Sequence, residues 1–202
     1  MELYIIRHGR TVWNKAGLIQ GTSDVELLPE GIEMARQTGV GLKDTHFDAV
    51  YSSPLKRAYD TAVMIKGDRE LEVIADVRLT EMGFGVCEGM KYVSKEDGGG
   101  LLEGFWESPD TYEAPEGGDT FYEVCERAAA FLKYVEQNHK DGERIMIVAH
   151  AAMNQAMFSY LENLEVKDFW KHGKQMNCAV TVAELKDGSW TIKDRNKIYY
   201  EI

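Results

Sequence analysis

The stretch LYIIRHGRT, residues 3–11, decides the fold that we expect for this chain. It opens with four apolar residues, mostly β-branched or aromatic, which is typical of a short buried strand. The strand ends at Arg7, so His8 stands at its carboxyl end, where open α/β sheets form their ligand crevices. Positive charge on Arg7 and Arg10 favours the neutral, nucleophilic form of the imidazole between them. Gly9 leaves room for a ligand beside the backbone, and this cationic segment favours an anion such as phosphate.

The composition indicates one globular domain over residues 1–202. Hydrophobic residues make up 44% of the chain and charged residues 28%, with no Pro- or Ser-rich linker. The formal net charge of −11 argues against a general surface for nucleic acid or for an anionic membrane. No run approaches the ~20 apolar residues of a membrane-spanning helix. We therefore expect neither nucleic acid nor a membrane as a partner, and no pattern points to a particular oligomeric state.

The cysteines predict the compartment. Cys87, Cys125 and Cys178 are odd in number and widely spaced, which fits neither a disulfide framework nor a zinc ribbon and favours a reducing environment. Met1 leads directly into the first strand, so a secretory signal has no room before it. We expect a cytoplasmic protein.

Strand and helix patterns alternate along the rest of the chain. Further strands are expected at residues 48–51, 71–75 and 144–149, and helices at residues 29–41, 54–66, 120–138 and 152–161. A polar loop is expected at residues 10–28. Ser53 is the predicted N-cap and Pro54 the first residue of helix 54–66. Residues 178–185 and 190–195 alternate around a Lys-Asp-Gly turn, which is typical of a hairpin. This order indicates an α/β sheet that is largely parallel with an antiparallel edge.

Side chains suited to phosphoryl transfer stand at the ends of these strands. Two strands end on a histidine, His8 and His150, and another leads to Arg57 in the first turn of a helix. Because the carboxyl ends of parallel strands lie on one side of a sheet, these groups can converge, and the loop of Glu81 can close over them. Arginines bind phosphate oxygens, and a neutral imidazole can accept the phosphoryl group. A carboxylic acid can protonate the leaving oxygen and then, as a carboxylate, deprotonate water.

A metal site is the chemical alternative for the same side chains. His8, His150 and Glu81 are all possible ligands. The neighbouring arginines would repel a divalent cation, and the chain has no HExxH or similar ligand spacing. We therefore expect no metal at this site.

The stretch RHGRTVWN, residues 7–14, resembles the signature of the histidine phosphatase superfamily, which includes the phosphoglycerate mutases. Further segments agree with that family in its own order and span nearly the whole chain: SSPLKRA at 52–58, LTE at 79–81 with FG at 84–85 and EG at 88–89, GGDT at 117–120, and IVAH at 147–150. The resemblance implies a three-layer α/β/α sandwich of the phosphoglycerate mutase type. Residues from about 86 to 118 would then form a lid or substrate loop.

The resemblance also implies a phosphohistidine mechanism. His8 matches the nucleophile, which attacks phosphorus through one ring nitrogen while a backbone carbonyl holds the other. Arg7, Arg57 and His150 match the groups that bind the phosphoryl oxygens and stabilise their charge. Glu81 matches the proton donor to the leaving alcohol. No metal or other cofactor is required, because arginines and imidazoles supply the positive charge.

Substrate contacts are implied for a second set of residues. Asn14 matches a supporting phosphate ligand, and Gln20 with Gly21 matches the segment that touches the rest of the substrate. Gly9 and Ala151 are expected to complete the phosphate site through their backbones. The expected partner is a small phosphorylated metabolite.

Several positions depart from the family pattern or stay open. Arg10 stands where Glu or Gln is usual, and it is either an extra substrate contact or a solvated side chain. Ala151 and Ala152 stand where glycine is more usual, and Cys87 where an aromatic residue is common. Glu88 is a nearby rival to Glu81 as the acid.

Other side chains are assigned structural positions. The aromatic side chains between residues 105 and 112 are expected to pack within the lid. Glu123, Glu126 and Arg127 are expected on an exposed helix face. His46, His139 and His172 have no motif around them and receive no role.

Three functions fit these residues. The leading hypothesis is a metal-independent phosphomonoesterase that acts through phosphohistidine on His8. The second is a cofactor-dependent phosphoglycerate mutase, which needs a substantial lid to shield the phosphohistidine from water. The chain between Glu81 and His150 is short for such a lid, so hydrolysis is favoured. The third is a catalytically silent protein that binds a phosphorylated ligand.

Overall fold

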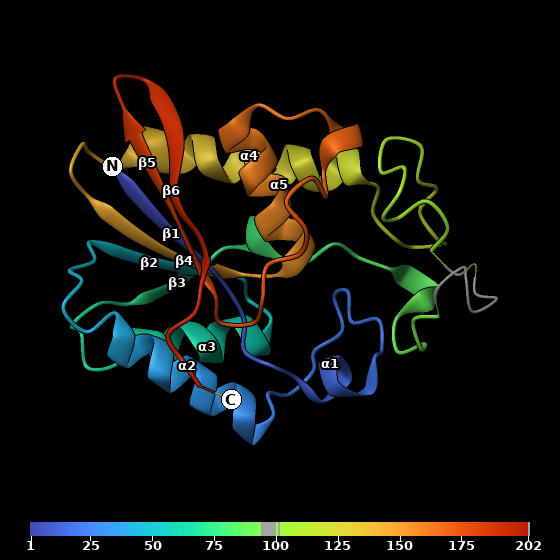
Figure 1. The fold of residues 1–202 in the computed structure, drawn as a ribbon, viewed down its shortest axis with the longest axis horizontal. Helices are drawn as coiled ribbons and strands as arrows, with labels where there is room; N and C mark the ends of the chain where they lie inside the picture. Colours follow the sequence, from blue (N-terminus) through green and yellow to red (C-terminus); the bar gives the residue numbers. More distant parts are fainter. Residues whose placement is uncertain (94–99, 101, 202) are drawn as a thin grey trace.

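The central element of the computed structural model is a β-sheet with helices on both faces (Figure 1). The structure describes residues 1–93, 100 and 102–201. These residues build a six-stranded sheet in the order β3-β2-β4-β1-β5-β6, in which β1 to β4 are parallel and β5 runs antiparallel to β1. The strands are β1 Glu2–Arg7, β2 Ala49–Ser52, β3 Val73–Ala75, β4 Arg144–Ala149, β5 Val180–Lys186 and β6 Ser189–Lys197. The expected three-layer sandwich, largely parallel with an antiparallel edge, is confirmed.

Each face of the sheet has its own apolar core. Helices α4 and α5 cover one face, and α2 and α3 cover the other (Figure 1). Ile5 of β1 belongs to the first core and its neighbour Ile6 to the second, because successive side chains of a strand point to opposite faces. The helices are α1 Val12–Ala16, α2 Pro29–Gly41, α3 Lys56–Lys66, α4 Phe121–Asn138 and α5 Ala151–Glu162, with 3-10 turns η1 Val77–Leu79, η2 Gly85–Cys87 and η3 Val166–Asp168.

The register of the two central strands sets up the candidate site. Arg7 at the end of β1 pairs with Ala149 at the end of β4, so both strands stop at the same level. The amide of His8 donates to the carbonyl of Ala149 over 3.0 Å, and the amide of Ser53 donates to the carbonyl of Val148, also over 3.0 Å. The residues that follow β1, β2 and β4 therefore leave the sheet side by side.

Three predicted boundaries are wrong for identifiable reasons. Helix α3 begins at Lys56 rather than at Pro54, because Leu55 has an extended backbone and is the N-cap. Asp24 from a distant loop accepts the amide hydrogen of Lys56 over 2.9 Å. Ser53 therefore does not cap the helix, although Arg57 stays in its first turn. The polar loop predicted for residues 10–28 contains α1, which a capping box between Thr11 and Asn14 stabilises. The predicted strand 71–75 has only its last three residues in the sheet.

Residues 102–118 lie beyond the end of the sheet toward which β1 runs (Figure 1). Phe105 packs there against Phe121 of α4 and Trp170, with ring centroids 5.1 and 5.4 Å apart. The predicted lid, residues 86–118, includes residues 94–99 and 101, which lie outside the described residues. No helix in the described part of the chain is long and apolar enough to cross a membrane.

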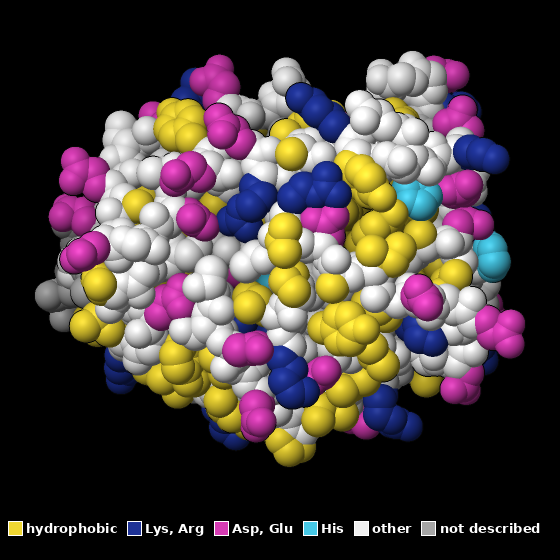
Figure 2. Space-filling view, turned by 180° about the vertical axis from the view of Figure 1, so that it is seen from behind, with side chains coloured by type: hydrophobic (Ala, Val, Ile, Leu, Met, Phe, Trp, Pro, Cys, Tyr) yellow, Lys and Arg dark blue, Asp and Glu magenta, His cyan; other side chains and the backbone are white. Residues whose placement is uncertain are grey.

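Charged side chains of both signs share the surface. On the face in Figure 2, Asp and Glu side chains are interspersed with Lys and Arg. A net charge of −11 is therefore compatible with clusters of positive charge at particular places on the surface.

Candidate active site

His8 occupies a buried position directly after β1, with 2% of its surface exposed. Its Nδ1 lies 2.7 Å from the carbonyl oxygen of Gly9. A carbonyl can only accept a hydrogen bond, so Nδ1 carries the hydrogen and Nε2 keeps its lone pair. The ring is thus oriented with one nitrogen free for nucleophilic attack.

The surroundings of His8 keep its ring neutral. Burial, followed by the charges of Arg57 and Arg7, holds its pKa well below the usual value of 6.5. The sequence interpretation assigned this effect to Arg7 and Arg10. The structure replaces Arg10 by Arg57, because Arg10 is half exposed and forms an ion pair with Glu30 at 3.2 Å. Arg10 is therefore engaged at the surface.

His150 lies next to His8 at the start of α5. The centroids of the two rings are 5.2 Å apart, with 58° between the ring planes. His150 is fully buried, and neither ring nitrogen bonds any residue that the structure describes. Burial and the charge of Arg57 hold the pKa of His150 well below 6.5 as well. Two neutral imidazoles therefore share one buried space.

Arg7 and Arg57 bring positive charge to the imidazoles while carbonyl oxygens hold them in place. Arg7 Nη1 donates to the carbonyl of Gln175 over 2.8 Å. Arg57 donates to the carbonyls of Gly21 and Ser23, both over 2.7 Å. The buried Nε–H of each arginine has no partner among the described residues. Burial lowers the pKa of Arg7 to about 10 and also lowers the pKa of Arg57, although the charge of Glu81 opposes both shifts. An anion bound between them would pair with both buried charges.

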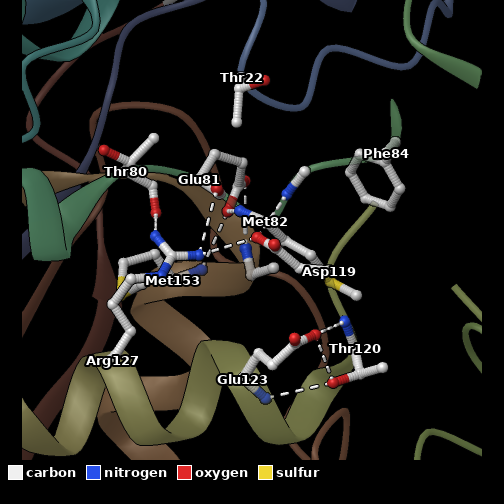
Figure 3. Close-up of polar contacts among 12 residues, drawn as sticks. Thr22, Thr80, Glu81, Met82, Phe84, Asp119, Thr120, Glu123, Arg127 and Met153 are labelled. Carbon is white, nitrogen blue, oxygen red and sulfur yellow. Dashed lines mark hydrogen bonds and ion pairs between the residues drawn. The ribbon is translucent and has the colours of Figure 1, made fainter. Parts of the chain in front are cut away.

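Glu81 is buried beside the first turn of α5. Its Oε1 accepts the amide hydrogens of Met82 and Met153, both over 3.0 Å, and its Oε2 accepts that of Ala152 over 3.3 Å (Figure 3). Oε2 makes the longer contact and is the oxygen better placed to exchange a proton with a ligand. The carboxyl group therefore lies at the start of the helix that follows His150.

The rival acid Glu88 has a different task. Its carboxylate accepts hydrogen bonds from the amides of Thr22, Ser23 and Phe84 at 2.8 to 3.1 Å. Burial raises the pKa of Glu88, but these hydrogen bonds and the one from the Ser23 hydroxyl together have a larger effect in the opposite direction. The net result is a lowered pKa. Glu88 thus stays ionised and holds the loop whose carbonyls anchor Arg57.

The structure changes the interpretation of Gly9. Its amide donates to the hydroxyl of Thr61 over 3.0 Å, so that N–H is already used within the protein. A Cβ on Gly9 would stand 2.5 Å from the carbonyl oxygen of Gly31 in α2. Glycine is therefore needed for the close approach of a helix rather than of a ligand, and Gly9 contributes its carbonyl to orient His8.

A cavity of about 140 Å³ opens beside these groups. Six of the sequence-predicted residues line it: Arg7, Asn14, Gln20, Gly21, Glu81 and Ala151. His8, Arg57 and His150 are buried and are not among its lining residues, although Arg7 and Ala151, the chain neighbours of the two histidines, are. A larger groove of about 750 Å³ lies between α4, α5 and the β5–β6 hairpin, but it is lined by no Arg, Lys or His. The smaller cavity is therefore the candidate site for a phosphate ester.

Sequence reasoning missed several residues around the cavity. Phe84, Phe105, Trp106 and Trp170 form an apolar wall, so two of the aromatic residues assigned to lid packing also face the site. Lys174 lines the cavity as well, and Gln175 holds Arg7. No motif marks the segment from 170 to 175, which reaches the site only through the fold.

Arg127 corrects another expectation. It was predicted on an exposed helix face, but it bonds the carbonyl of Thr80 and the carboxylate of Asp119 and is half buried. In the part of the chain that the structure describes, no three His, Cys, Asp or Glu side chains are grouped as metal ligands.

The low pKa values of His8 and His150 predict a loss of stability in acid. Below pH ~6.5 the imidazoles of the unfolded chain bind protons that the folded protein does not bind, so acid stabilises the unfolded state relative to the folded state. We expect each ring to lower the free energy of unfolding by about 1 kcal/mol between pH 7 and pH 5.5. Urea unfolding at both pH values measures this loss. The variant His8→Ala should lose less than the wild type, and an unchanged pH dependence would contradict the assignment.

Known proteins share this arrangement of sequence and fold. A metal-independent phosphoserine phosphatase from Arabidopsis thaliana is 34% identical over 194 residues, which cover 95% of this chain and 79% of the relative. A 2,3-bisphosphoglycerate-dependent phosphoglycerate mutase from Cytophaga hutchinsonii is 32% identical, with 82% of this chain and 79% of the relative covered. The crystal structure of phosphoserine phosphatase in complex with 3-phosphoglyceric acid from Entamoeba histolytica has a TM-score of 0.83 and 31% identity, with 97% and 96% of the chains covered.

The family match extends over almost the whole chain. The model of the histidine phosphatase superfamily (branch 1) matches residues 3–198, which include both histidines, both buried arginines and Glu81. The chain therefore belongs to the histidine phosphatase superfamily and is a phosphomonoester hydrolase.

Proposed function

We propose that the protein hydrolyses a small phosphorylated carboxylic acid, without a metal, through a phosphohistidine intermediate on His8. One observation carries the proposal. A neutral imidazole that keeps its Nε2 lone pair lies beside a second imidazole and two buried arginines, and the Nε–H of each arginine has no hydrogen-bond partner among the described residues. A phosphate dianion complements this arrangement in both charge and donor geometry.

In the first step the phosphoryl group moves to His8. The two arginines and His150 bind its oxygens while Nε2 attacks phosphorus opposite the ester oxygen. The N–P bond forms as the P–O bond to the alcohol breaks, and Glu81 gives its proton to the departing oxygen. The ring becomes cationic, and its Nδ1–H bond to the Gly9 carbonyl strengthens because a charged donor makes a stronger hydrogen bond.

In the second step water takes the phosphoryl group from His8. Glu81, now a carboxylate, accepts a proton from the water as its oxygen attacks phosphorus. The N–P bond breaks, its electrons return to Nε2, and inorganic phosphate leaves. Both His8 and Glu81 end in their starting protonation states, so the cycle is balanced.

The cavity favours a small substrate with a second negative charge. Its volume of about 140 Å³ is below the ~300–1,000 Å³ typical of pockets for drug-sized ligands. Burial and the nearby charge of Arg7 lower the pKa of Lys174, whose ammonium forms no ion pair with a described residue. That ammonium lies 5.8 Å from the centroid of the Trp106 ring and so covers a surface on which a flat base would stack. The named relatives act on phosphoserine or bind 3-phosphoglyceric acid, and both ligands carry a carboxylate.

Residues 86–118 are proposed as the substrate loop of this site. Phe105 and Trp106 from this segment line the cavity next to Lys174. They would exclude water from one side of a bound ester, which strengthens charge interactions there.

Trapping of the phosphoenzyme tests the proposed reaction. Wild-type protein mixed with phosphoserine carrying labelled phosphorus, and quenched within one turnover, should retain label that is lost on acid treatment. The His8→Ala variant should retain none. If the wild type takes up no label and releases no phosphate from phosphoserine, 3-phosphoglycerate or p-nitrophenyl phosphate, the proposal is wrong. Interconversion of 3- and 2-phosphoglycerate faster than phosphate release would instead indicate a mutase.

Lys174 gives a prediction about selectivity. The substrates 3-phosphoglycerate and glycerol 3-phosphate share a carbon skeleton, but only the first has a carboxylate. In Lys174→Met, the ratio of their kcat/KM values should fall about 10- to 150-fold, since one charge-assisted contact contributes about 1.5–3 kcal/mol. Lys171 lies in the same loop but does not line the cavity, so Lys171→Met is the matched control and should keep the ratio. Equal losses for both substrates would exclude Lys174 from carboxylate recognition.

A further inference from the structure

The motif Gly117-Gly118-Asp119-Thr120 has no part in the mechanism above, yet it lies against the loop of the proposed acid. Glu81 belongs to residues 80–83, which form neither helix nor strand. The position of a carboxyl group on such a segment depends on the contacts that hold the backbone of the segment. The contacts of residues 80–83 therefore decide where the proton donor stands.

Arg127 of α4 holds the segment on one side of Glu81. Its Nη1 donates to the carbonyl of Thr80, and its Nη2 lies 3.4 Å from the carbonyl oxygen of Glu81 itself (Figure 3). A guanidinium presents several N–H groups in one rigid plane, so one side chain can bind successive carbonyls. The backbone at Thr80 and Glu81 is thus tied to a helix that does not touch the phosphate site.

Asp119 holds the other side of Glu81. Its amide donates to the carbonyl of Gly83, and its Oδ2 accepts the amide hydrogen of Gly83, both over 2.9 Å. The same Oδ2 accepts a hydrogen bond from Arg127 Nη2 over 3.0 Å. Arg127 therefore bonds the backbone before Glu81, Asp119 bonds the backbone after it, and the two side chains bond each other.

The start of α4 fixes both side chains in place. Thr120 is the N-cap of α4, and its capping box with Glu123 has hydrogen bonds of 3.3 and 2.7 Å (Figure 3). Asp119 precedes this cap, and Arg127 follows it about two helical turns later, so both face the same loop. The motif thus specifies the helix start that puts the two charges together.

We propose that Asp119 and Arg127 are positioning residues that set the carboxyl group of Glu81 against the leaving oxygen of the substrate. This inference rests on the proposed role of Glu81 as proton donor. A half-exposed ion pair by itself contributes little to folding. Here both partners also bond the backbone around the acid, and Glu81 Oε1 is anchored from the opposite side by the amide of Met153. Loss of the bonds from either residue would let the carboxyl group of Glu81 move, while Arg7, Arg57 and the two imidazoles stay in position.

The test compares leaving groups. An alkyl ester such as phosphoserine needs a proton on its leaving oxygen, whereas p-nitrophenyl phosphate has a good leaving group. In Arg127→Met we expect kcat/KM for phosphoserine, which reports on the step that cleaves the ester, to fall about 10- to 100-fold. The kcat/KM for p-nitrophenyl phosphate should change much less. Asp119→Asn, which keeps an acceptor oxygen but no charge, should show the same pattern in weaker form. Arg127→Lys should restore only part of the rate, because an ammonium cannot span the same acceptors.

A double variant separates positioning from general damage. In a Glu81→Gln background, Arg127→Met should cause almost no further loss with phosphoserine, because the group it positions is already absent. The matched control is Arg144→Met, which removes an ion pair with Glu2 at the other end of β4. That control should leave the ratio of the two kcat/KM values unchanged.

The outcomes separate the two proposals. If Arg127→Met and Asp119→Asn slow both esters equally, or add their full effect to Glu81→Gln, the two residues have a structural role and the inference is overturned. If Glu81→Gln itself slows both esters equally, the acid assignment fails first, and the positioning role falls with it. Phosphoenzyme trapping would still report on His8 in that case.

Discussion

The His8→Ala variant will lose turnover while it continues to bind the substrate. Without Nε2 no N–P bond can form, so kcat should fall by at least about 10⁴-fold, as is typical when an enzyme nucleophile is removed. The phosphate ligands remain, since Arg7 and Arg57 are anchored by carbonyls of other loops. Titration calorimetry of the variant with phosphoserine should therefore still detect binding.

His150→Ala is the informative partner of this experiment. It removes the neighbouring ring, whose centroid lies 5.2 Å from that of His8, but it leaves the nucleophile. We expect it to be slow, yet to form a trappable phosphoenzyme. If His8→Ala retained measurable turnover, or if His150→Ala rather than His8→Ala abolished the label, the two histidines would have to exchange roles.

Local patterns predict those parts of the site that depend on strand ends. The apolar stretch of β1 and that of β4 are each followed by histidine, and parallel pairing then brings His8 and His150 together. The register cannot be seen in either stretch alone. The aligned strand ends are explained by burial, because each strand has a layer of helices on both faces. Each strand therefore ends where its apolar residues give way to polar ones.

Contacts between distant segments account for what local patterns miss. The first amide of α3 donates to Asp24, which lies 32 residues earlier in the chain. The local pattern of Ser53 and Pro54 therefore predicted the helix start at the wrong residue. Lys174 reaches the cavity only because the segment after α5 folds back over it. Arg127 looks like a surface residue in its helix pattern, because nothing in the sequence of α4 shows that a loop lies against it.

The Arg57→Ala variant should have the second largest effect. Its guanidinium is the charge with the largest effect on the pKa of both His8 and His150. Loss of one positioned donor to transition-state charge costs about 3–4 kcal/mol, or roughly 10²- to 10³-fold in kcat/KM. Arg57→Lys should recover little, since lysine cannot bond two carbonyls and still direct an Nε–H toward the phosphate.

A pH profile distinguishes this role from simple damage to the loop. Removal of a positive charge makes the protonated imidazole less costly, so the pKa of His8 and His150 should rise. The acid limb of the kcat/KM profile should therefore move to higher pH in Arg57→Ala. Glu88→Gln loosens the same loop, because Glu88 holds the amides of Thr22 and Ser23, but it leaves the cation in place. It should lower the rate without moving that limb. A wild-type rate in Arg57→Ala would show that this guanidinium does not act on the phosphate, and an unshifted limb would show that it does not act on the imidazoles.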